Sequence, residues 1–440
     1  MRALIRSARG RSVGALSLLL ALAGPARAQE GPGERDEALA TADSIRAALV
    51  RPPGEPPADW VDVAEVPLQV IGFPLRLAFV ALPGWLATQI TAPRPPGPLV
   101  RAYRAVDAWG VRPTIRTSIG PRSAAAVELQ VHRWEPFYAH SALSRRGSQR
   151  HRAGVLLSGR RSTFTAEARW QRDAQVPFYG IGPDAERDRG LYRRDYWDVR
   201  ARGGFRPSRT WSFDLGAGFE ENRIGDPIWT DDTTLEERFG ASGLYGARER
   251  TRYLRLDGGA TLDLTGWKDF QDRGAWFRAQ GGVYRGVGGT DSDFHFLTGI
   301  AQGYLPLNGR QQLALRGLAS IVRADGGEGV PFFHLSKLGG PETALGYPSS
   351  RFNDNDMIAL QAEWRYEVWR DIHNLVRSEF FLYFAEGAVG RRLDEVGSGD
   401  WRPSYGVGGR LAARERLLGV AFVGWSGEGV HLGLRGAWPL

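Results

Sequence analysis

The side chains most able to do chemistry are scattered along this chain. Seven His residues occur among 440, and none stands in a His-x-x-x-His or similar spacing that would place two imidazoles on one metal ion. The chain has no Cys, which excludes thiol catalysis and thiolate metal ligands. No Gly-x-Ser-x-Gly esterase motif precedes residue 98, and no Ser, His and acid are tied together in sequence. The sequence therefore predicts no catalytic residue, no cofactor, no metal site and no enzyme.

The densest group of oxygen ligands is the run Phe352-Asn353-Asp354-Asn355-Asp356. Its side chains are rich enough in oxygen to hold Ca²⁺, but it lacks the Gly and the distant Glu of a calcium-binding loop. We interpret this run as a solvated loop, and we interpret the acids of 184–188 and 231–232 in the same way.

The first 28 residues have the organisation of an export signal. Arg2, Arg6, Arg9 and Arg11 precede an apolar run over 13–23, and Ala26-Arg27-Ala28 gives the small-x-small cleavage pattern. This run is shorter than the about 20 apolar residues that a membrane helix needs. We predict a cleavable signal peptide over 1–28, with an uncleaved anchor as the alternative. Its removal takes away five Arg and no acid, so the formal net charge falls from +8 to +3, which does not indicate nucleic-acid binding.

From residue 98 onward the chain is a series of strand-length segments. Between 252 and 264, apolar side chains such as Leu254 and Leu256 alternate with polar ones such as Arg255 and Asp257, and 358–368 and 430–438 repeat the pattern. A charged face over about ten residues suits a wet lumen and would spoil the core of a soluble sandwich. The high content of Gly (57) and Trp (15) also fits a barrel with aromatic girdles. We predict an all-β fold, a transmembrane antiparallel β-barrel over 98–440 in the bacterial outer membrane.

The spacers between these segments alternate in length. Tight spacers at 120–123, 159–162, 206–209 and 308–310 alternate with long ones at 173–190, 221–248 and 325–355, as in outer-membrane barrels with short turns on one side and long loops on the other. Fifteen strands can be placed, one of them over 138–158. Because bacterial single-chain barrels have an even number of strands, we expect sixteen, with the remaining strand in 98–108.

Residues 29–97 differ from the barrel. A helical pattern over 34–50 ends at four Pro between 52 and 57, and the apolar stretch over 66–90 carries three Pro that disfavour a spanning helix. We expect a short periplasmic helical and Pro-rich segment. Its apolar pieces would lie on the inner leaflet of the outer membrane or in the barrel mouth, and a plain tether is the alternative.

Four motifs in order resemble those of the bacterial surface antigen superfamily, which includes outer-membrane assembly factors, two-partner-secretion transporters and patatin-fused barrels. The segment 335–347, closed by 351–354, resembles its signature loop. The segment 178–182 resembles an aromatic-glycine mark of an earlier extracellular loop, 384–387 resembles a Phe-x-Asp-x-Gly strand, and 405–410 resembles the Gly-rich strand that follows. The resemblance covers roughly 111–440. It implies sixteen strands with the signature loop between the eleventh and twelfth, and five segments do follow residue 355.

The tip of the signature loop departs from the superfamily. There the loop folds back into the lumen, and an Arg-Gly-aromatic tip places its Arg against acidic groups of the inner wall. The corresponding tip here follows Gly339 and Gly340 and reads Leu345-Gly346-Tyr347, so that Leu replaces the Arg.

The expected acidic wall is nevertheless present in the sequence. The resemblance places Glu386 at the acidic wall position, with Glu363 one strand away. Arg351, followed by Phe352, is the nearest substitute cation on the loop, and the alternative is that Arg351 is simply solvated. If Glu386 holds the loop, Glu386→Ala loosens the loop and raises the conductance in planar bilayers.

The resemblance also bears on function. Superfamily members that assemble or secrete proteins carry polypeptide-transport-associated (POTRA) domains, for which 29–97 is too short and too rich in Pro, so we expect a short-headed branch. A weak seam between the first and last strands implies a barrel that assists insertion or translocation of outer-membrane proteins or lipids. The expected partners are outer-membrane lipid and either client outer-membrane proteins or a periplasmic accessory protein. A passive pore or structural barrel is the first alternative, and a barrel enzyme acting on lipid is the second.

Overall fold

The computed structural model describes residues 105–436 except for 117–120, 123–125, 132–135, 231, 241–242, 249, 266–272, 328, 371–375, 399–400 and 414–415. The predicted signal peptide over 1–28 and the predicted segment over 29–97 lie outside the described residues. Among the described residues, no helix is long and apolar enough to cross a bilayer.

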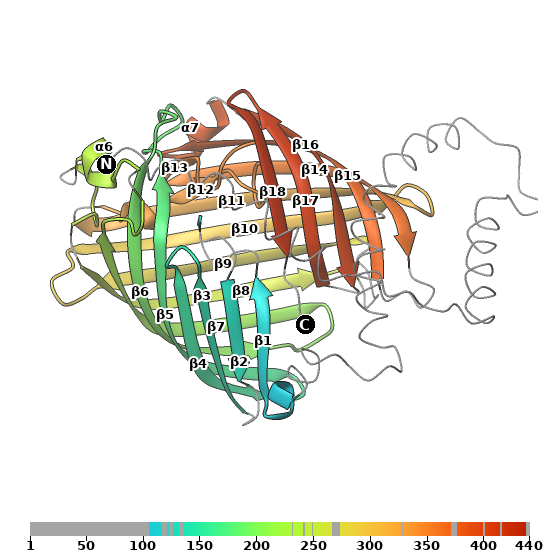
Figure 1. The fold of residues 1–440 in the computed structure, drawn as a ribbon, viewed down its shortest axis with the longest axis horizontal. Helices are drawn as coiled ribbons and strands as arrows, with labels where there is room; N and C mark the ends of the chain where they lie inside the picture. The colour runs from blue at the N-terminus through green and yellow to red at the C-terminus, as the bar shows by residue number, and fades with distance from the viewer. Residues whose placement is uncertain are drawn as a thin grey trace, which may run out of the picture. The chain divides into compact units, whose positions relative to one another are not determined.

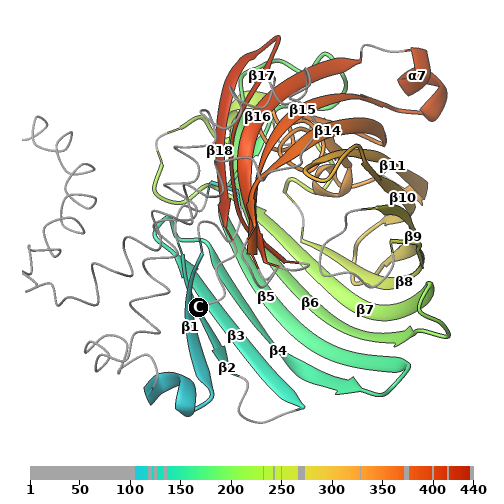
Figure 2. The same ribbon diagram turned by 90° about the vertical axis from the view of Figure 1, so that its right-hand side faces the viewer.

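The described strands form one antiparallel sheet of sixteen, in which each strand pairs with the next one along the chain. Figure 2 shows them following one another around a curved sheet, from β1 in cyan to β18 in red. The strands are β1 (Val111–Arg116), β2 (Ala126–Val131), β3 (Phe137–Ser144), β4 (Gln149–Ser158), β5 (Ser162–Phe178), β6 (Gly190–Phe205), β7 (Trp211–Gly225), β8 (Thr251–Asp263), β9 (Gly274–Gly286), β10 (Ser292–Pro306), β11 (Gln311–Gly327), β14 (Asp356–Arg370), β15 (Val376–Gly390), β16 (Arg402–Ala413), β17 (Arg416–Ser426) and β18 (Gly429–Gly436).

Smaller elements lie in the connections. The strands β12 (Ser336–Leu338) and β13 (Phe352–Asp354) pair only with each other, within the connection from β11 to β14. The helix α6 (Leu235–Phe239) lies between β7 and β8, and α7 (Leu393–Ser398) lies between β15 and β16. Figure 1 shows α6, α7 and the β12–β13 hairpin at one end of the sheet. The predicted alternation of long loops and short turns is therefore present, and the signature loop does join the eleventh and twelfth strands.

The number of strands agrees with the prediction, but the placement of one strand was wrong. The segment 138–158 is not one strand, because Gly147, with a φ of 83°, turns the chain between β3 and β4. The backbone amide of Gly147 donates to the carbonyl of Ser144 at 3.2 Å and closes this turn. The strand expected in 98–108 is not needed to reach sixteen. Residues 105–108 are helical, and 98–104 lie outside the described residues.

The alternation of side chains follows the prediction. On β8, Leu254 and Leu256 are half exposed on the outer face, whereas Asp257 is buried on the inner face. There the Arg255 guanidinium lies 2.8 Å from the Asp257 carboxylate, and Arg202 of β6 contacts the same carboxylate. Asp257 thus meets opposite charges on the inner face, which is the condition for burying it. The outer face is the apolar surface of a lipid-facing barrel.

Candidate functional site

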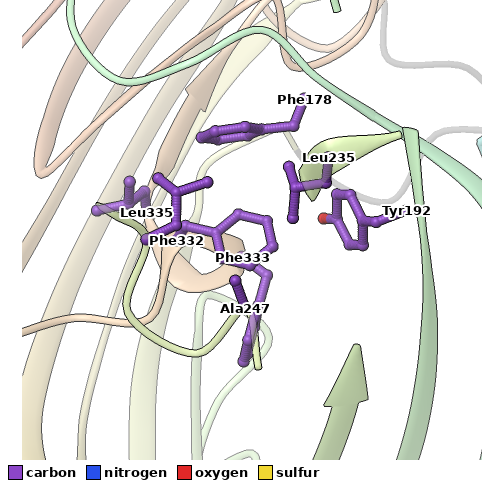
Figure 3. Packing of buried hydrophobic residues seen from close by; sticks show 8 residues of the cluster. Phe178, Tyr192, Leu235, Ala247, Phe332, Phe333 and Leu335 are labelled. Carbon is purple, nitrogen blue, oxygen red and sulfur yellow. The ribbon is translucent and has the colours of Figure 1, made fainter. Parts of the chain in front are cut away.

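The connection from β11 to β14, residues 329–355, is called the signature loop below. It begins in a 3₁₀ turn, η3 (Phe332–His334), whose Phe332 and Phe333 are buried. Figure 3 shows these rings and Leu335 packed against Phe178 from the end of β5 and Tyr192 from the start of β6. Phe332 lies 5.0 Å from both the Phe178 and the Tyr192 ring, centroid to centroid, in edge-to-face geometry. The start of the loop is therefore an aromatic core on the concave side of the sheet.

The middle of the loop is a compact turn that depends on two glycines. Gly339 and Gly340 have φ angles of 118° and 84°, a region that favours Gly. A Cβ on Gly339 would lie 2.3 Å from the carbonyl oxygen of Pro348, so no larger residue fits. The amide of Gly340 donates to the carbonyl of Tyr347 at 3.0 Å, and that of Ala344 donates to Gly340 at 2.8 Å. These bonds close the turn that presents residues 342–347, called the tip below.

Leu345, at the position of the superfamily Arg, is buried in an apolar seat. It packs against Phe381, Tyr383 and Ala385 of β15 and against Phe422 of β17. The backbone of Leu345 lies close to β17 at Gly424, because a Cβ on Gly424 would lie only 2.6 Å from the Leu345 carbonyl oxygen. The side chain that the sequence marked as a missing cation is a hydrophobic anchor, which burial of its surface stabilises.

Polar contacts to four strands fix the backbone on either side of Leu345. The amide of Gly346 donates to Ser404 Oγ of β16 at 2.7 Å, and Ser426 Oγ of β17 donates to the Gly346 carbonyl at 3.0 Å. The Tyr383 hydroxyl of β15 donates to the Thr343 carbonyl at 3.1 Å, and Gln361 of β14 donates to the Glu342 carbonyl at 2.8 Å. In addition, Arg316 of β11 donates to the Glu342 carbonyl at 3.0 Å and lies 3.6 Å from the Glu342 carboxylate. Neutral hydrogen bonds and apolar contact thus hold Thr343 to Tyr347, and the charged contact of the tip lies at its first residue.

Tyr347 and Phe352 join the tip to the hairpin of β12 and β13. Their ring centroids are 5.3 Å apart in edge-to-face geometry, and both side chains are buried with Leu338, Met357 and Val389. A Cβ on Gly387 would lie 2.5 Å from Leu338 Cδ1, so this Gly of β15 faces the loop.

The expectation that Glu386 lies on the inner wall is wrong in this structure. Glu386 shares its face of β15 with Leu382 and Phe384, which are 44% and 40% exposed on the outside of the sheet. The inner face carries Tyr383, Ala385 and Gly387 instead. Counted back from Gly387, the acidic position of a Phe-x-Asp-x-Gly pattern is Ala385, and because strand side chains alternate, a shift of one residue changes the face.

Glu363 does lie on the inner face, but loop residues do not neutralise it. Arg365 of the same strand contacts Glu363 at 2.7 Å, and Arg410 of β16 lies 3.6 Å from it. Arg410 also pairs with Glu379 of β15. The wall therefore supplies both signs of charge for this network, and the tip takes no part in it.

Arg351 is neither solvated nor paired with Glu363 or Glu386. It is 2% exposed, and its Nε and Nη2 reach the Glu428 carboxylate at 2.8 and 2.7 Å. Nη2 also donates to the Ala185 carbonyl at 2.8 Å, and the guanidinium carbon lies 4.5 Å from the Phe352 ring centroid. Glu428 is in the turn between β17 and β18. Arg351 thus binds an acceptor 77 residues away in the sequence, and nothing in the spacing of the sequence predicted this pair.

The oxygen-rich run at the end of the loop has structural partners. Asp356 pairs with Arg323 of β11, and the Asn353 side chain donates to the Gly180 carbonyl at 3.3 Å. Within the described part of the chain, no group of three or more His, Asp or Glu could hold a metal ion. The sequence therefore missed what this run does: it ties the loop to the β5–β6 connection.

Two titratable side chains are enclosed at the start of the loop. Burial lowers the pKa of His334, even though the Glu220 carboxylate lies 2.9 Å from its Nε2. Burial also lowers the pKa of Lys337 to about 8, and the nearby charge of Arg194 acts in the same direction. Both groups thus lose their protons more readily in the folded loop than in the unfolded chain.

With this geometry in view, the fold matches known structures. BamA from Haemophilus ducreyi lacking POTRA domains 1-3 is 14% identical, with 77% of this chain and 76% of that chain covered and a TM-score of 0.52. CdiB from Escherichia coli is 14% identical, with 75% and 61% covered and a TM-score of 0.48. No protein-family model and no curated protein matches the sequence. The chain therefore shares the fold of the BamA barrel, which confirms the predicted all-β fold with sixteen antiparallel strands.

Proposed function

We propose that the protein inserts or translocates outer-membrane proteins or lipids through the edge between β1 and β18. The observation that carries this proposal is the pairing of the sheet. Among the described residues, β1 pairs only with β2, and β18 pairs only with β17. Each end strand therefore presents backbone donors and acceptors along one side, which a strand of a client protein can pair with.

The outer face of β18 supports the same proposal. Val430, Leu432 and Leu434 on the outer face of β18 are among the most exposed apolar side chains described, so this edge also offers apolar surface to lipid or to a client.

A reversible lock tests this function. The chain has no Cys, so two Cys substitutions, one among 111–116 and one among 430–435, introduce its only thiols. In proteoliposomes with a chaperone-held outer-membrane protein as client, we expect the oxidised pair to stop insertion and reduction to restore it. Oxidised protein that inserts the client as fast as reduced protein contradicts the proposal, and so does a panel in which no pair forms.

The matched control lies one strand away. Val423 and Leu432 are directly opposite each other in the ladder of β17 and β18, so Val423→Cys with Leu432→Cys crosslinks strands that already pair. We expect this crosslink to leave insertion unchanged. High single-channel conductance of the unlocked protein, without client insertion, would instead favour a passive pore.

A further inference from the structure

We propose that Arg351 and Glu428 form a latch that ties the last hairpin, β17–β18, to the signature loop and to the β5–β6 connection. The latch is a positioning device for the edge that the proposed function uses, and it rests on that function only for its purpose. It is distinct from the contacts that hold Leu345 and Gly346, because it lies at the base of the loop and is ionic.

The geometry of the pair is that of a specific contact. Arg351 uses two nitrogens on the two carboxylate oxygens of Glu428, at 2.8 and 2.7 Å, and this bidentate arrangement fixes direction as well as distance. The guanidinium lies between the Phe352 and Tyr179 rings, 4.5 and 5.2 Å from their centroids. With Arg351 buried and the Glu428 side chain 19% exposed, water competes weakly for the pair.

The β5–β6 connection completes the latch from the other side of the loop. Arg351 Nη2 donates to the Ala185 carbonyl at 2.8 Å, and Arg187 donates to the Gly427 carbonyl at 3.1 Å. Arg402, near the start of β16, donates to the Pro183 carbonyl at 3.0 Å. The turn of the last hairpin is thus held by side chains from two separate connections, in addition to its own ladder.

The position of the latch gives it leverage over the edge. Glu428 lies in the turn that joins β17 to β18. Among the described residues, β18 pairs only with β17. When β18 moves away, its turn must move with it, and Arg351 is left buried without its carboxylate. Opening of the edge is therefore coupled to release of the loop base, because an unpaired buried cation is costly.

Spin labels on the two sides of the latch test this coupling. Asp188→Cys and Val430→Cys place one label on the β5–β6 connection and one on β18, both at exposed side chains. In the labelled protein we expect one short, narrow distance distribution. Adding Glu428→Gln, which keeps the shape and removes the charge, should raise the ratio of long to short distances about tenfold.

A control variant separates the latch from general loosening. Glu186→Gln removes a carboxylate of the same connection that pairs with Arg238 rather than with the last hairpin, so its distribution should stay narrow. Equal broadening in both variants, or no broadening in Glu428→Gln, overturns the proposal. Hydrogen exchange of the β18 amides, expected to accelerate in Glu428→Gln while the β4–β5 amides stay unchanged, gives a second reading. Neither measurement uses a client, so failure of the latch and failure of the proposed function are told apart.

Discussion

The tip and the base of the signature loop are held by opposite kinds of contact. At the tip, Leu345 lies in an apolar seat and neutral hydrogen bonds fix the neighbouring backbone. At the base, Arg351 makes a bidentate ion pair with Glu428. The first contact is to the wall strands, whereas the second is to the turn of the last hairpin. The two ends of one loop thus anchor it to a fixed part of the sheet and to an edge.

The difference shows how the loop tolerates the loss of its expected cation. An ionic tip would need a cation at 345 on the loop and an acid at 385 on the inner face of β15. These residues are Leu and Ala, and they lie in one apolar cluster. Apolar contact involves no charge, whereas an ion pair fails when one partner moves away and leaves the other charge unpaired. The loop is therefore anchored by apolar contact at its tip and by a separable ion pair at its base.

The largest effect should come from placing the missing cation at the tip. Leu345→Arg puts a charge into the apolar cluster of Phe381, Phe422 and Ala385, which should destabilise the protein by about 3–5 kcal/mol. Adding Ala385→Asp should recover a large part of this loss, and Leu345→Met should cost little. Urea unfolding in detergent, arranged as a double-mutant cycle, measures the coupling. Additive losses in the double variant would mean that residue 385 does not face the tip.

A smaller loss is expected at the base. Arg351→Met keeps much of the side-chain volume and leaves Glu428 half-buried without its cation, so we expect a loss of about 2 kcal/mol. Arg187 also reaches the last hairpin, but its side chain is 67% exposed. Arg187→Met should therefore change the free energy of unfolding by less than about 0.5 kcal/mol. Similar losses for both would show that burial does not set the strength of this anchor.

The sequence predicted the features that recur from strand to strand, above all the alternation of side chains between the two faces. Alternation along β8 placed Leu254 outside and Asp257 inside, because lipid and a wet lumen impose a period of two on every strand. Contacts between connections were not predictable, since Arg351 and Glu428 are joined by no periodicity. The Glu386 assignment failed by one residue, and in a strand one residue is enough to change the face.

The prediction of a single strand over 138–158 failed for a different reason. The run Arg145-Arg146-Gly147-Ser148 lies between two strand-length segments, and of these four residues only Gly147 has a positive φ that marks the turn. A single Gly among many in a Gly-rich chain is a weak signal, so the first strand was sought too early in the sequence.

The start of the loop should respond to pH. Lys337 has a folded pKa of about 8, below its ordinary value of 10.5, so the unfolded chain holds more protons between these values and stability rises as pH increases from about 8 to about 10.5. Lys337→Met should remove this rise and stabilise the protein at pH 7 by about 1–2 kcal/mol. Urea unfolding of both proteins from pH 7 to 10 tests it. A slope that persists in the Met variant would assign the titration to another group.

The smallest effect is expected at Glu386, where the sequence had predicted a large one. Its carboxylate lies on the outer face of β15 with Leu382 and Phe384, away from the loop, so Glu386→Ala should leave planar-bilayer conductance unchanged. Tyr383→Phe, three positions earlier on the inner face, removes the hydroxyl that donates to the Thr343 carbonyl and should raise the frequency of open events. The two variants share a strand and differ in face, so conductance that rises in Glu386→Ala and not in Tyr383→Phe would reverse the assignment of the faces of β15.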